Sequence, residues 1–246
     1  MTTPEISVVK IGGSVLNSDD TAGKLIGCLK PRLKPGSTVL IHGGGGDINM
    51  WLGRLGIKPR FLEGQRVTDP DTMKVVEMVL SGLMNKRLVN LLGSEGINAA
   101  GLSGRDGNLA IAGIIDEKLG SVGAVREVNP RILFGIMGSG MMPVVSPVSS
   151  GPEGEPVNVN ADFFAAEIAS ALGASELNLV TASGGVIENG RIVGEISCGG
   201  IPELISGGVA TDGMIPKLQA AAAARKGGVR RVNILNYEGQ TGTCVL

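Results

Sequence analysis

Short apolar runs that end directly in glycines are the feature of this sequence that most limits its fold. Residues 6–11 run into Gly12 and Gly13, and residues 38–41 are followed by His42 and the glycines at 43–46. Two further runs end in the same way, residues 99–102 before the glycine-rich segment 103–107 and residues 177–181 before 184–185. Repeated units of buried strand, glycine turn and helix are typical of parallel β/α architecture.

Helical patterns separate these predicted strands. Pro70 suits the first position of the longest helix, and the apolar stripe of that helix indicates a core face or a dimer surface. We expect helices at 19–34, from about 47, at 70–92, at 162–172 and at 217–226, hairpins at 113–128 and 186–193, a polar loop at 149–156, and strands at 144–145 and 229–235. The predicted boundary lies near 173–176, between an N-terminal lobe (1–173) and a C-terminal lobe (174–246).

Composition excludes several classes of protein. Aromatic residues make up only 2% of the chain and the formal net charge is −1, whereas nucleic-acid binding needs a basic face or stacking platforms. The N-terminus lacks the segments of a signal peptide, and glycines and prolines interrupt the longest uncharged stretch, residues 132–151. Three cysteines without CxxC spacing and a single histidine do not suit a structural zinc site. We therefore expect a cytoplasmic protein with reduced thiols that binds no nucleic acid or membrane and holds no metal of its own.

The glycine turns themselves point to an anion. A turn without Cβ atoms lets backbone N–H groups converge on an anion, and the dipole of the following helix favours negative charge. A single turn of this kind is explained by tight packing, but four of them at the carboxyl edge of a parallel sheet indicate a ligand site. The sequence contains neither the P-loop motif nor the GxGxxG fingerprint, which disfavours a P-loop kinase and a Rossmann dehydrogenase.

Three charged residues stand at unusual places. Lys10 lies inside the first apolar run, where an unpaired lysine is costly to bury, so we favour anion binding over an edge position. Lys217 follows Pro216 at a helix start, which favours an anion, although a solvated surface lysine is the alternative. Asp162 opens a helix, either as part of the chemistry or as an ordinary residue of a first helical turn.

These motifs, in this order, resemble the amino acid kinase family. The shared segments span nearly the whole chain: VKIGGS (9–14), HGGG (42–45), GQRVTD (64–69), VEMV (76–79), NK (85–86), GLSGRDG (101–107), GSVG (120–123), NVNAD (158–162) and GMIPK (213–217). The segments around Arg66 and Asn158 are the more specific to members that phosphorylate an N-acylated amino acid, whereas the glycine turns are shared with carbamate, uridylate and aspartate kinases. The resemblance implies an α/β fold, a three-layer αβα sandwich around a mainly parallel open sheet.

The resemblance also implies a role for individual positions. Lys10 and Lys217 would bind the transferring phosphoryl group, and Asp162 would hold both lysines in place. Arg66 would clamp the α-carboxylate of the substrate, and Asn158 would bind its N-acyl amide. Gly44 and Gly45 would lie against the substrate or the transferred phosphate. The nucleotide would be contacted by Gly12, Gly13, Thr181, Ser183, Gly184, Gly213 and Met214.

The activity that the resemblance implies is phosphorylation of the side-chain carboxylate of N-acetyl-L-glutamate, a step of arginine biosynthesis. ATP with Mg²⁺ would be the phosphoryl donor, and the enzyme would be a homodimer. One alternative is a related acceptor, aminoadipate in lysine biosynthesis or N-succinylglutamate, because one methylene is worth only about 1–3 kcal/mol and the sequence does not separate them. Another is a catalytically idle, ligand-sensing homologue.

The chain departs from the family pattern in two places. Family members carry an aspartate after a Thr or Ser at the entry to the C-terminal lobe, where this chain has Thr181 and then Ala182. The contact to the ribose or the adenine is therefore in doubt. Few residues precede the first strand, whereas the arginine-inhibited hexamers of the family carry an additional N-terminal helix. We therefore expect a dimer without arginine feedback.

Overall fold

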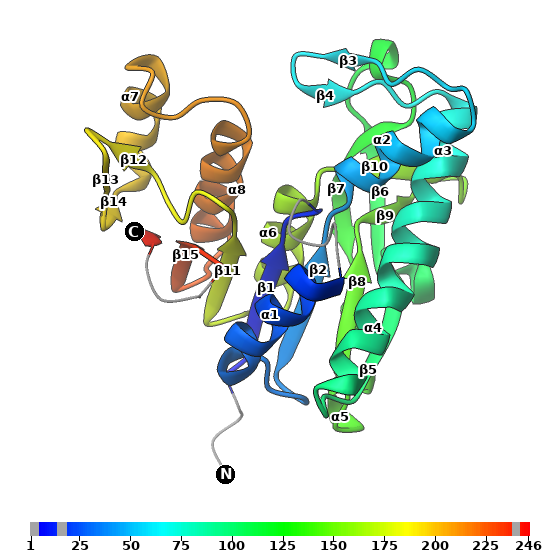
Figure 1. Cartoon of the computed structure of the whole chain (residues 1–246), viewed down its shortest axis with the longest axis horizontal. Helices are drawn as coiled ribbons and strands as arrows, with labels where there is room; N and C mark the ends of the chain where they lie inside the picture. The colour runs from blue at the N-terminus through cyan, green and yellow to red at the C-terminus, as the bar shows by residue number, and fades with distance from the viewer. Residues whose placement is uncertain (1–4, 14–18, 238–241) are drawn as a thin grey trace.

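An eight-stranded sheet forms the centre of the protein (Figure 1). In the computed structural model, which describes residues 5–13, 19–237 and 242–246, all neighbouring strands of this sheet are parallel except β15 and β16. Their order is β14 (Glu195–Ile196), β16 (Gly242–Val245), β15 (Arg231–Leu235), β11 (Glu176–Val180), β1 (Ser7–Ile11), β2 (Thr38–His42), β8 (Met142–Ser146) and β5 (Ala99–Ser103). The mainly parallel sheet is thus confirmed, and Ser14 of the first motif lies outside the described residues.

Helices cover both faces of the sheet and complete three layers (Figure 1). Alternate residues of β1 face opposite sides, so Val8 packs in one hydrophobic cluster with α6 and α8, and Val9 packs in a second with α1, α3 and α4. The helices are α1 (Asp19–Leu29), α2 (Gly45–Arg54), α3 (Pro70–Glu77), α4 (Asn85–Ser94), α5 (Arg131–Gly138), α6 (Ala161–Ala171), α7 (Ile201–Ser206) and α8 (Met214–Lys226). Short 3₁₀ turns occur at Lys30–Arg32, Asp106–Asn108, Glu117–Leu119 and Cys198–Gly200. The predicted αβα sandwich is confirmed.

Three central strands end level with one another. Ile11, the last residue of β1, pairs with His42 of β2 and with Val180 of β11. The segments that follow these strands, the two glycine turns and Thr181, therefore meet at one edge of the sheet. This carboxyl edge is where open α/β sheets bind ligands. The sheet includes strands of both predicted lobes, and the division into lobes stays a prediction.

The longest predicted helix contains a change of helix type. The Asp69 side chain caps α3 by accepting a hydrogen bond from Thr72 N at 2.9 Å. The following residues, Met78–Met84, form the π-helical segment η3 before α4 begins at Asn85. The apolar periodicity predicted a single helix over this region. A π turn shifts the side chains around the helix axis, but apolar residues continue along the sequence, so no break is visible there.

A small closed barrel lies beside the sheet. Its strands, in the order β10-β7-β6-β9, are Pro156–Val159, Val122–Val128, Ala110–Ile114 and Val148–Ser150. The hairpin expected at 113–128 is present as β6 and β7, with β6 beginning earlier. The polar loop expected at 149–156 was wrong at its ends, because these residues belong to β9 and β10, which pair with each other and with β6 and β7. Asn158 of β10 lines one cavity together with the glycine turn after β2, which places β10 beside the carboxyl edge of the sheet.

Short hairpins complete the chain. The predicted hairpin at 186–193 is present as β12 (Ile187–Glu188) and β13 (Arg191–Ile192), with left-handed backbone at the Asn189-Gly190 turn. A second hairpin, β3 (Phe61–Leu62) and β4 (Gln65–Arg66), and the strand β16, which lies between β14 and β15, were not predicted. The two-residue strands of this hairpin give too little alternation to be recognised in a sequence. No helix in the described part of the chain is both long and apolar enough to cross a membrane.

Candidate active site

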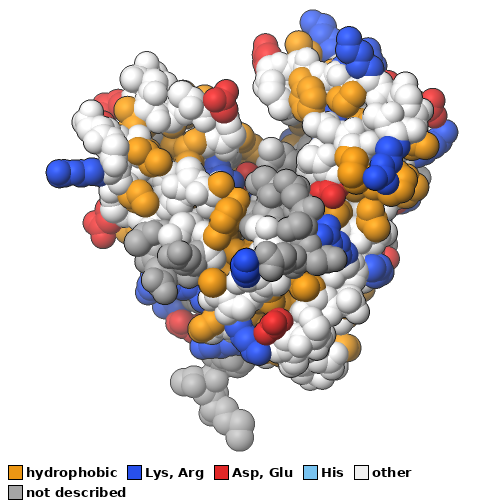
Figure 2. Space-filling view, in the orientation of Figure 1, with side chains coloured by type: hydrophobic (Ala, Val, Ile, Leu, Met, Phe, Trp, Pro, Cys, Tyr) orange, Lys and Arg blue, Asp and Glu red, His pale blue; other side chains and the backbone are white. Residues whose placement is uncertain are grey.

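Two cavities meet at the carboxyl edge of the sheet. One of about 540 Å³ lies on the side of β12 and α7, and one of about 290 Å³ lies under the β3–β4 hairpin. Asp162 lines both cavities, with Lys217 on the wall of the larger one and Lys10 on the wall of the smaller one. Figure 2 shows the molecule hollowed between the part that carries α7 and the part that carries β3 and β4. The arrangement suits two ligands that react where the cavities join.

Asp162 binds both lysines at the junction of the cavities. Lys10 Nζ lies 2.8 Å from Asp162 Oδ1, and Lys217 Nζ lies 3.0 and 3.1 Å from Oδ1 and Oδ2. All three side chains are buried, with residue exposures of 6–7%. Lys10 comes from β1, Asp162 from the first turn of α6 and Lys217 from the first turn of α8. Three residues far apart in sequence thus form one buried charged cluster, as the interpretation of the two lysines as functional residues requires.

The charges of this cluster shift the pKa values of its members. Burial, and after it the positive charge of Lys10, lower the pKa of Lys217 to about 8 against the opposing effect of Asp162. Burial raises the pKa of Asp162, but the two ammonium groups outweigh burial and hold that pKa below its usual value. Two cations and one anion leave a net positive charge of about one in a desolvated place. The cluster therefore attracts an anion.

Asn160 sets the position of Asp162 in the first turn of α6. Its side-chain oxygen accepts hydrogen bonds from the backbone N–H groups of Asp162 and Phe163, at 2.9 and 3.4 Å. This is the N-cap interaction that fixes where a helix begins. No role was predicted for Asn160, although an asparagine two residues before a helix-start aspartate is a recognisable capping signal.

The two glycine turns that end β1 and β2 lie against each other. A Cβ atom on Gly13 would be 2.6 Å from Gly44 N, so this close approach is open only to glycine. Gly43 N donates to Ile11 O at 3.1 Å and ties the second turn to the end of β1. Gly13, Gly44 and Gly45 line the smaller cavity, and Gly12 lines the larger one.

Arg66 forms one wall of the smaller cavity. Its Nη2 donates to Gly45 O at 3.1 Å, and its guanidinium stacks over the ring of Phe61 at 4.9 Å from the centroid. Its Nη1 is buried and has no partner among the described residues. Burial lowers the pKa of Arg66, but a guanidinium remains charged near neutral pH. A buried, charged and unpaired donor at a cavity wall fits the carboxylate that was predicted for this residue.

Asn158 lies in the same cavity and is held by Thr68. Its Nδ2 donates to Thr68 Oγ1 at 3.1 Å, and Thr68 Oγ1 donates to Arg66 O at 2.9 Å. The fully buried Thr68 therefore connects the two residues predicted to bind the substrate. The roles of Thr68 and Phe61 were not predicted, since neither side chain is charged and Thr68 stands in the GQRVTD motif only as a neighbour of Arg66.

The larger cavity contains most residues predicted to contact the nucleotide. Thr181, Ser183, Gly213 and Met214 line it, together with several residues that the sequence analysis had not assigned to the site: Ala182, Gly185, Val186, Ile187, Val209 and Thr211. Gly184 does not line this cavity. Its φ of +73° and the packing of Asn236 against it give it a role in the shape of the turn instead.

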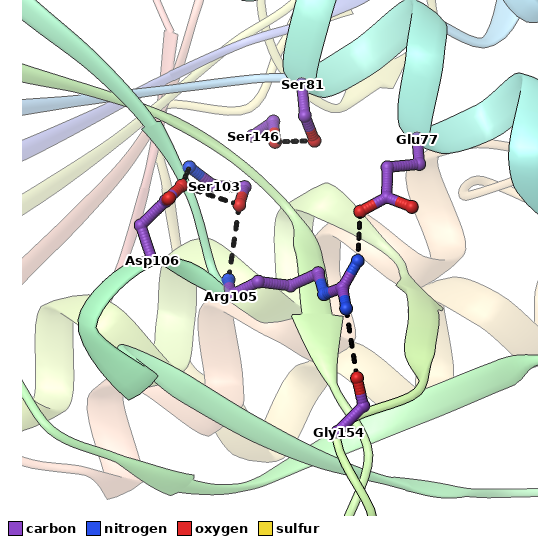
Figure 3. A network of polar contacts seen from close by, with 7 residues as sticks. All are labelled: Glu77, Ser81, Ser103, Arg105, Asp106, Ser146 and Gly154. Carbon is purple, nitrogen blue, oxygen red and sulfur yellow. Dashed lines mark hydrogen bonds and ion pairs between the residues drawn. The ribbon is translucent and has the colours of Figure 1, made fainter.

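The glycine-rich turn after β5 lines neither of these two cavities. Ser103 N and Oγ donate to Asp106 Oδ2 at 2.7 and 2.8 Å, and Arg105 pairs with Glu77 and donates to Gly154 O at 2.9 Å (Figure 3). These contacts tie the turn to α3 and to the segment between β9 and β10. The turn therefore holds the small barrel against the long helix.

No cluster of three or more His, Cys, Asp or Glu side chains that could hold a metal ion occurs within residues 5–13, 19–237 and 242–246. The buried cations, the free Arg66 donor and the glycine turns suit anionic ligands directly.

The fold and this site, two lysines around one carboxylate between two cavities, define the class of protein. The profile of the amino acid kinase family matches residues 5–236, and the chain belongs to this family. The resemblance inferred from the sequence motifs is confirmed.

Two relatives and two solved structures are similar to this chain over nearly its whole length. Acetylglutamate kinase of Methanopyrus kandleri is 41% identical over 245 residues, which cover 95% of this chain and 96% of that protein. Acetylglutamate kinase of Ruegeria pomeroyi is 41% identical over 243 residues, covering 98% and 84% of the two chains. Among solved structures, smu.665 from Streptococcus mutans UA159 superposes with a TM-score of 0.86 at 32% identity and 98% coverage of both chains. Carbamate kinase from Giardia lamblia shares the fold, with a TM-score of 0.66 at 14% identity over 100% and 99% of the chains.

The electrostatics of the cluster can be measured on Lys217. In lysine-labelled protein, we expect its side-chain NMR signal to titrate near pH 8, while exposed lysines titrate near pH 10.4. Lys10→Met should raise this midpoint because a neighbouring cation is removed, and Asp162→Asn should lower it because the counter-charge is removed. Loss of the signal in Lys217→Arg provides the assignment.

The lowered pKa of Lys217 also determines whether the folded protein becomes more or less stable as the pH rises. The unfolded chain binds more protons than the folded protein between pH 8 and the reference value of 10.5. Lys217 by itself therefore makes the fold more stable as the pH rises through that interval. A wild-type midpoint near 10.4, or shifts of the same sign in the two variants, would contradict this description of the cluster.

Proposed function

We propose that the protein transfers the γ-phosphoryl group of ATP to the side-chain carboxylate of N-acetyl-L-glutamate, forming N-acetyl-L-glutamyl 5-phosphate and ADP in arginine biosynthesis. The observation that carries this proposal is the junction of two cavities at Asp162, with one buried lysine on each side. The relatives named acetylglutamate kinase, at 41% identity over nearly the full length, support the same reaction.

The acceptor needs no general base. A side-chain carboxyl group of this kind has an unperturbed pKa of about 4.3, so it is already ionised at neutral pH. The chain's single histidine, His42, is fully buried and lines neither cavity, and the proposed reaction does not require it as a base. The obstacle is the repulsion between the acceptor carboxylate and the phosphates of ATP.

The charged cluster counters this repulsion. One acceptor oxygen forms a bond to the γ-phosphorus while the bond from that phosphorus to the bridging oxygen of ADP breaks, so the electron pair of that bond leaves with ADP. Lys10 on the acceptor side and Lys217 on the nucleotide side stabilise the charge on the phosphoryl oxygens, and Asp162 keeps both ammonium groups aimed at the junction. Positioning and electrostatic stabilisation of this kind account for most of the catalysis of phosphoryl transfer.

We assign ATP to the larger cavity. Gly12 and Gly13 would present backbone N–H groups to its phosphates, and Thr181, Ser183, Gly213 and Met214 would contact the remainder of the nucleotide. Mg²⁺ would enter with ATP and neutralise part of the phosphate charge. Ala182, which lines this cavity in place of an acidic residue, leaves the contact to the ribose open.

We assign the acceptor to the smaller cavity. Arg66 would bind the α-carboxylate through its free Nη1, because a guanidinium fork matches a carboxylate. Asn158 would bind the N-acyl amide, and Gly44 and Gly45 would lie beside the reacting carboxylate. A cavity of about 290 Å³ suits a small dicarboxylic acyl amino acid.

Two alternative acceptors are to be compared with N-acetyl-L-glutamate in the activity measurement. N-succinylglutamate and aminoadipate present the same carboxylates with a longer chain or acyl group. An idle, ligand-sensing homologue would have no need for two buried lysines held by one aspartate, whose burial costs stability.

We also propose that the protein is a homodimer in the cytoplasm. Met78 and Leu83 of η3 are 50% and 45% exposed on the long helix, and this surface would pair two copies into a homodimer. The N-terminal lobe (1–173) would carry the acceptor and this dimer surface, and the C-terminal lobe (174–246) the nucleotide. The free thiols of Cys28, Cys198 and Cys244 suit the reducing cytoplasm.

The deciding experiment measures acyl phosphate as its hydroxamate. Purified protein with ATP and Mg²⁺ should give the product with N-acetyl-L-glutamate at a kcat/KM at least tenfold above that with N-succinylglutamate or aminoadipate. A higher value for either alternative acceptor would reassign the substrate. No product with any of the three would contradict the proposed reaction.

Lys217→Ala should reduce kcat roughly 10²–10³-fold, because a charge that stabilises the transferring phosphoryl group is removed. Binding of N-acetyl-L-glutamate, measured by titration calorimetry, should change less than about threefold, since Lys217 lies on the nucleotide side. Lys226→Ala, at the exposed end of the same helix, is the matched control and should match the wild type. An unchanged kcat in Lys217→Ala would remove this lysine from the mechanism.

Arg66→Lys should weaken N-acetyl-L-glutamate binding about ten- to a hundredfold, because an ammonium group cannot replace the two-pronged bond of a guanidinium to a carboxylate. The KM for ATP should stay near the wild-type value. Arg60→Lys, an exposed arginine that precedes the same hairpin, is the control. Equal dissociation constants for Arg66→Lys and wild type in calorimetry would show that the substrate carboxylate binds elsewhere.

A further inference from the structure

His42 and Asn85 form a fully buried polar pair directly behind the second glycine turn. His42 is the last residue of β2 and Asn85 the first residue of α4, and both have 0% exposure. Asn85 Nδ2 lies 3.2 Å from His42 Nε2, and His42 Nδ1 lies 3.2 Å from Gly43 O. The proposed reaction uses neither side chain, yet their contacts end at the glycine turn that lines the acceptor cavity.

The surroundings of Asn85 fix the orientation of its amide. Nδ2 donates to Leu102 O at 3.1 Å and to Val144 O at 2.9 Å, on β5 and β8. Oδ1 accepts from Lys86 Nζ at 3.2 Å, and that ammonium group also donates to Gly101 O at 2.9 Å. Gly101 leaves the space that the amide occupies, since a Cβ atom there would collide with Asn85 Oδ1. A reversed amide would place its oxygen against two carbonyl oxygens.

The orientation of Asn85 determines the tautomer of His42. The amide nitrogen of Asn85 has two hydrogens, which it shares among Leu102 O, Val144 O and His42 Nε2, and it has no acceptor to offer a proton on Nε2. Nε2 of His42 is therefore the acceptor and lacks a proton. Burial, and to a smaller extent nearby Lys10, lower the pKa of His42 to about 4 against the opposing effect of the bond to Gly43, so the ring is neutral at neutral pH. A neutral ring without a proton on Nε2 carries it on Nδ1, which then donates to Gly43 O.

This hydrogen bond orients the peptide between Gly43 and Gly44. In a trans peptide the C=O and the N–H point in opposite directions. Holding Gly43 O toward His42 therefore turns the Gly44 N–H to the other side, where Gly44 N lies against Gly13 and the acceptor cavity. No described residue accepts a hydrogen bond from Gly44 N.

We propose that His42, fixed as its Nδ1–H tautomer by Asn85, is a positioning residue that keeps the Gly44 N–H directed into the acceptor cavity, toward the oxygens of the anion bound there. Without this bond the peptide is free to rotate and to present the Gly43 carbonyl oxygen to that anion. A repelling oxygen then replaces a donating N–H at the place where negative charge is transferred. The kinetic part of this inference rests on the proposed function.

The tautomer can be observed directly, because the chain contains one histidine. In protein labelled with ¹⁵N-histidine, long-range ¹H–¹⁵N correlation at pH 7 should show a protonated Nδ1 and an unprotonated Nε2. An Nε2–H tautomer or a charged ring would overturn the inference, whatever the activity of the protein.

Two substitutions of His42 separate the hydrogen bond from packing. His42→Asn keeps an N–H donor at the position of Nδ1, whereas His42→Leu has similar size and no donor. Asn85 keeps its two carbonyl acceptors in both variants. His42→Leu should reduce kcat about tenfold to a hundredfold with a smaller change in the KM for N-acetyl-L-glutamate, and His42→Asn should recover most of that loss.

Val39→Ala, a buried change elsewhere on β2, controls for loss of stability and should keep the wild-type kcat. A kcat in His42→Leu within about twofold of wild type would overturn the inference, as would equal losses in the Leu and Asn variants.

The amide signals of the glycine turn provide a readout that does not depend on the reaction. In ¹⁵N-labelled protein without substrate, the Gly44 N–H signal should shift in His42→Leu and stay near its wild-type position in His42→Asn. An inactive wild type with these shifts would contradict the proposed function alone. Unchanged Gly44 signals in His42→Leu would overturn the inference itself.

Discussion

The carboxylate of Asp162 between two buried ammonium groups is the interaction on which the site depends. Each lysine alone would be costly to bury at the end of a parallel sheet, and the shared aspartate offsets part of that cost. One positive charge remains uncompensated, which attracts anions to the junction and, after burial, contributes to the lowered pKa of Lys217. β1, α6 and α8 each contribute one charged residue to this cluster, so the cluster depends on how these three elements pack together.

The glycine turns and the charged cluster contribute different kinds of group to the site. In the proposed reaction the lysines would supply charge, and the turns would supply directed N–H groups at distances that side chains with a Cβ would not permit. Backbone groups can serve in this way only if their peptides are held, and the contacts of Gly43 N with Ile11 and of Gly43 O with His42 hold the two peptides on either side of Gly43. Rigidity at the carboxyl edge of the sheet is therefore part of the proposed chemistry.

Much of the fold was predictable because its signals are local. Apolar runs that end in glycine predicted the central strands, and Lys10 within such a run marked the cluster. β9, β10 and β16 were missed because each also pairs with a strand far away in the sequence. Thr68 was missed for a similar reason, since it acts through Asn158, 90 residues away.

The sequence by itself determined the parallel β/α order, the family and the identity of the charged residues, because strand alternation, glycine turns and helix starts are properties of neighbouring residues. Only the tertiary structure decided which glycine turns face the cavities. The turns after β1 and β2 do, whereas the turn after β5 ties α3 to the barrel through Arg105. The physical reason is that a glycine turn has the same local form in both roles. Its function depends on whether buried charges or packing partners lie opposite, and contacts between residues far apart in the chain determine which of these it meets.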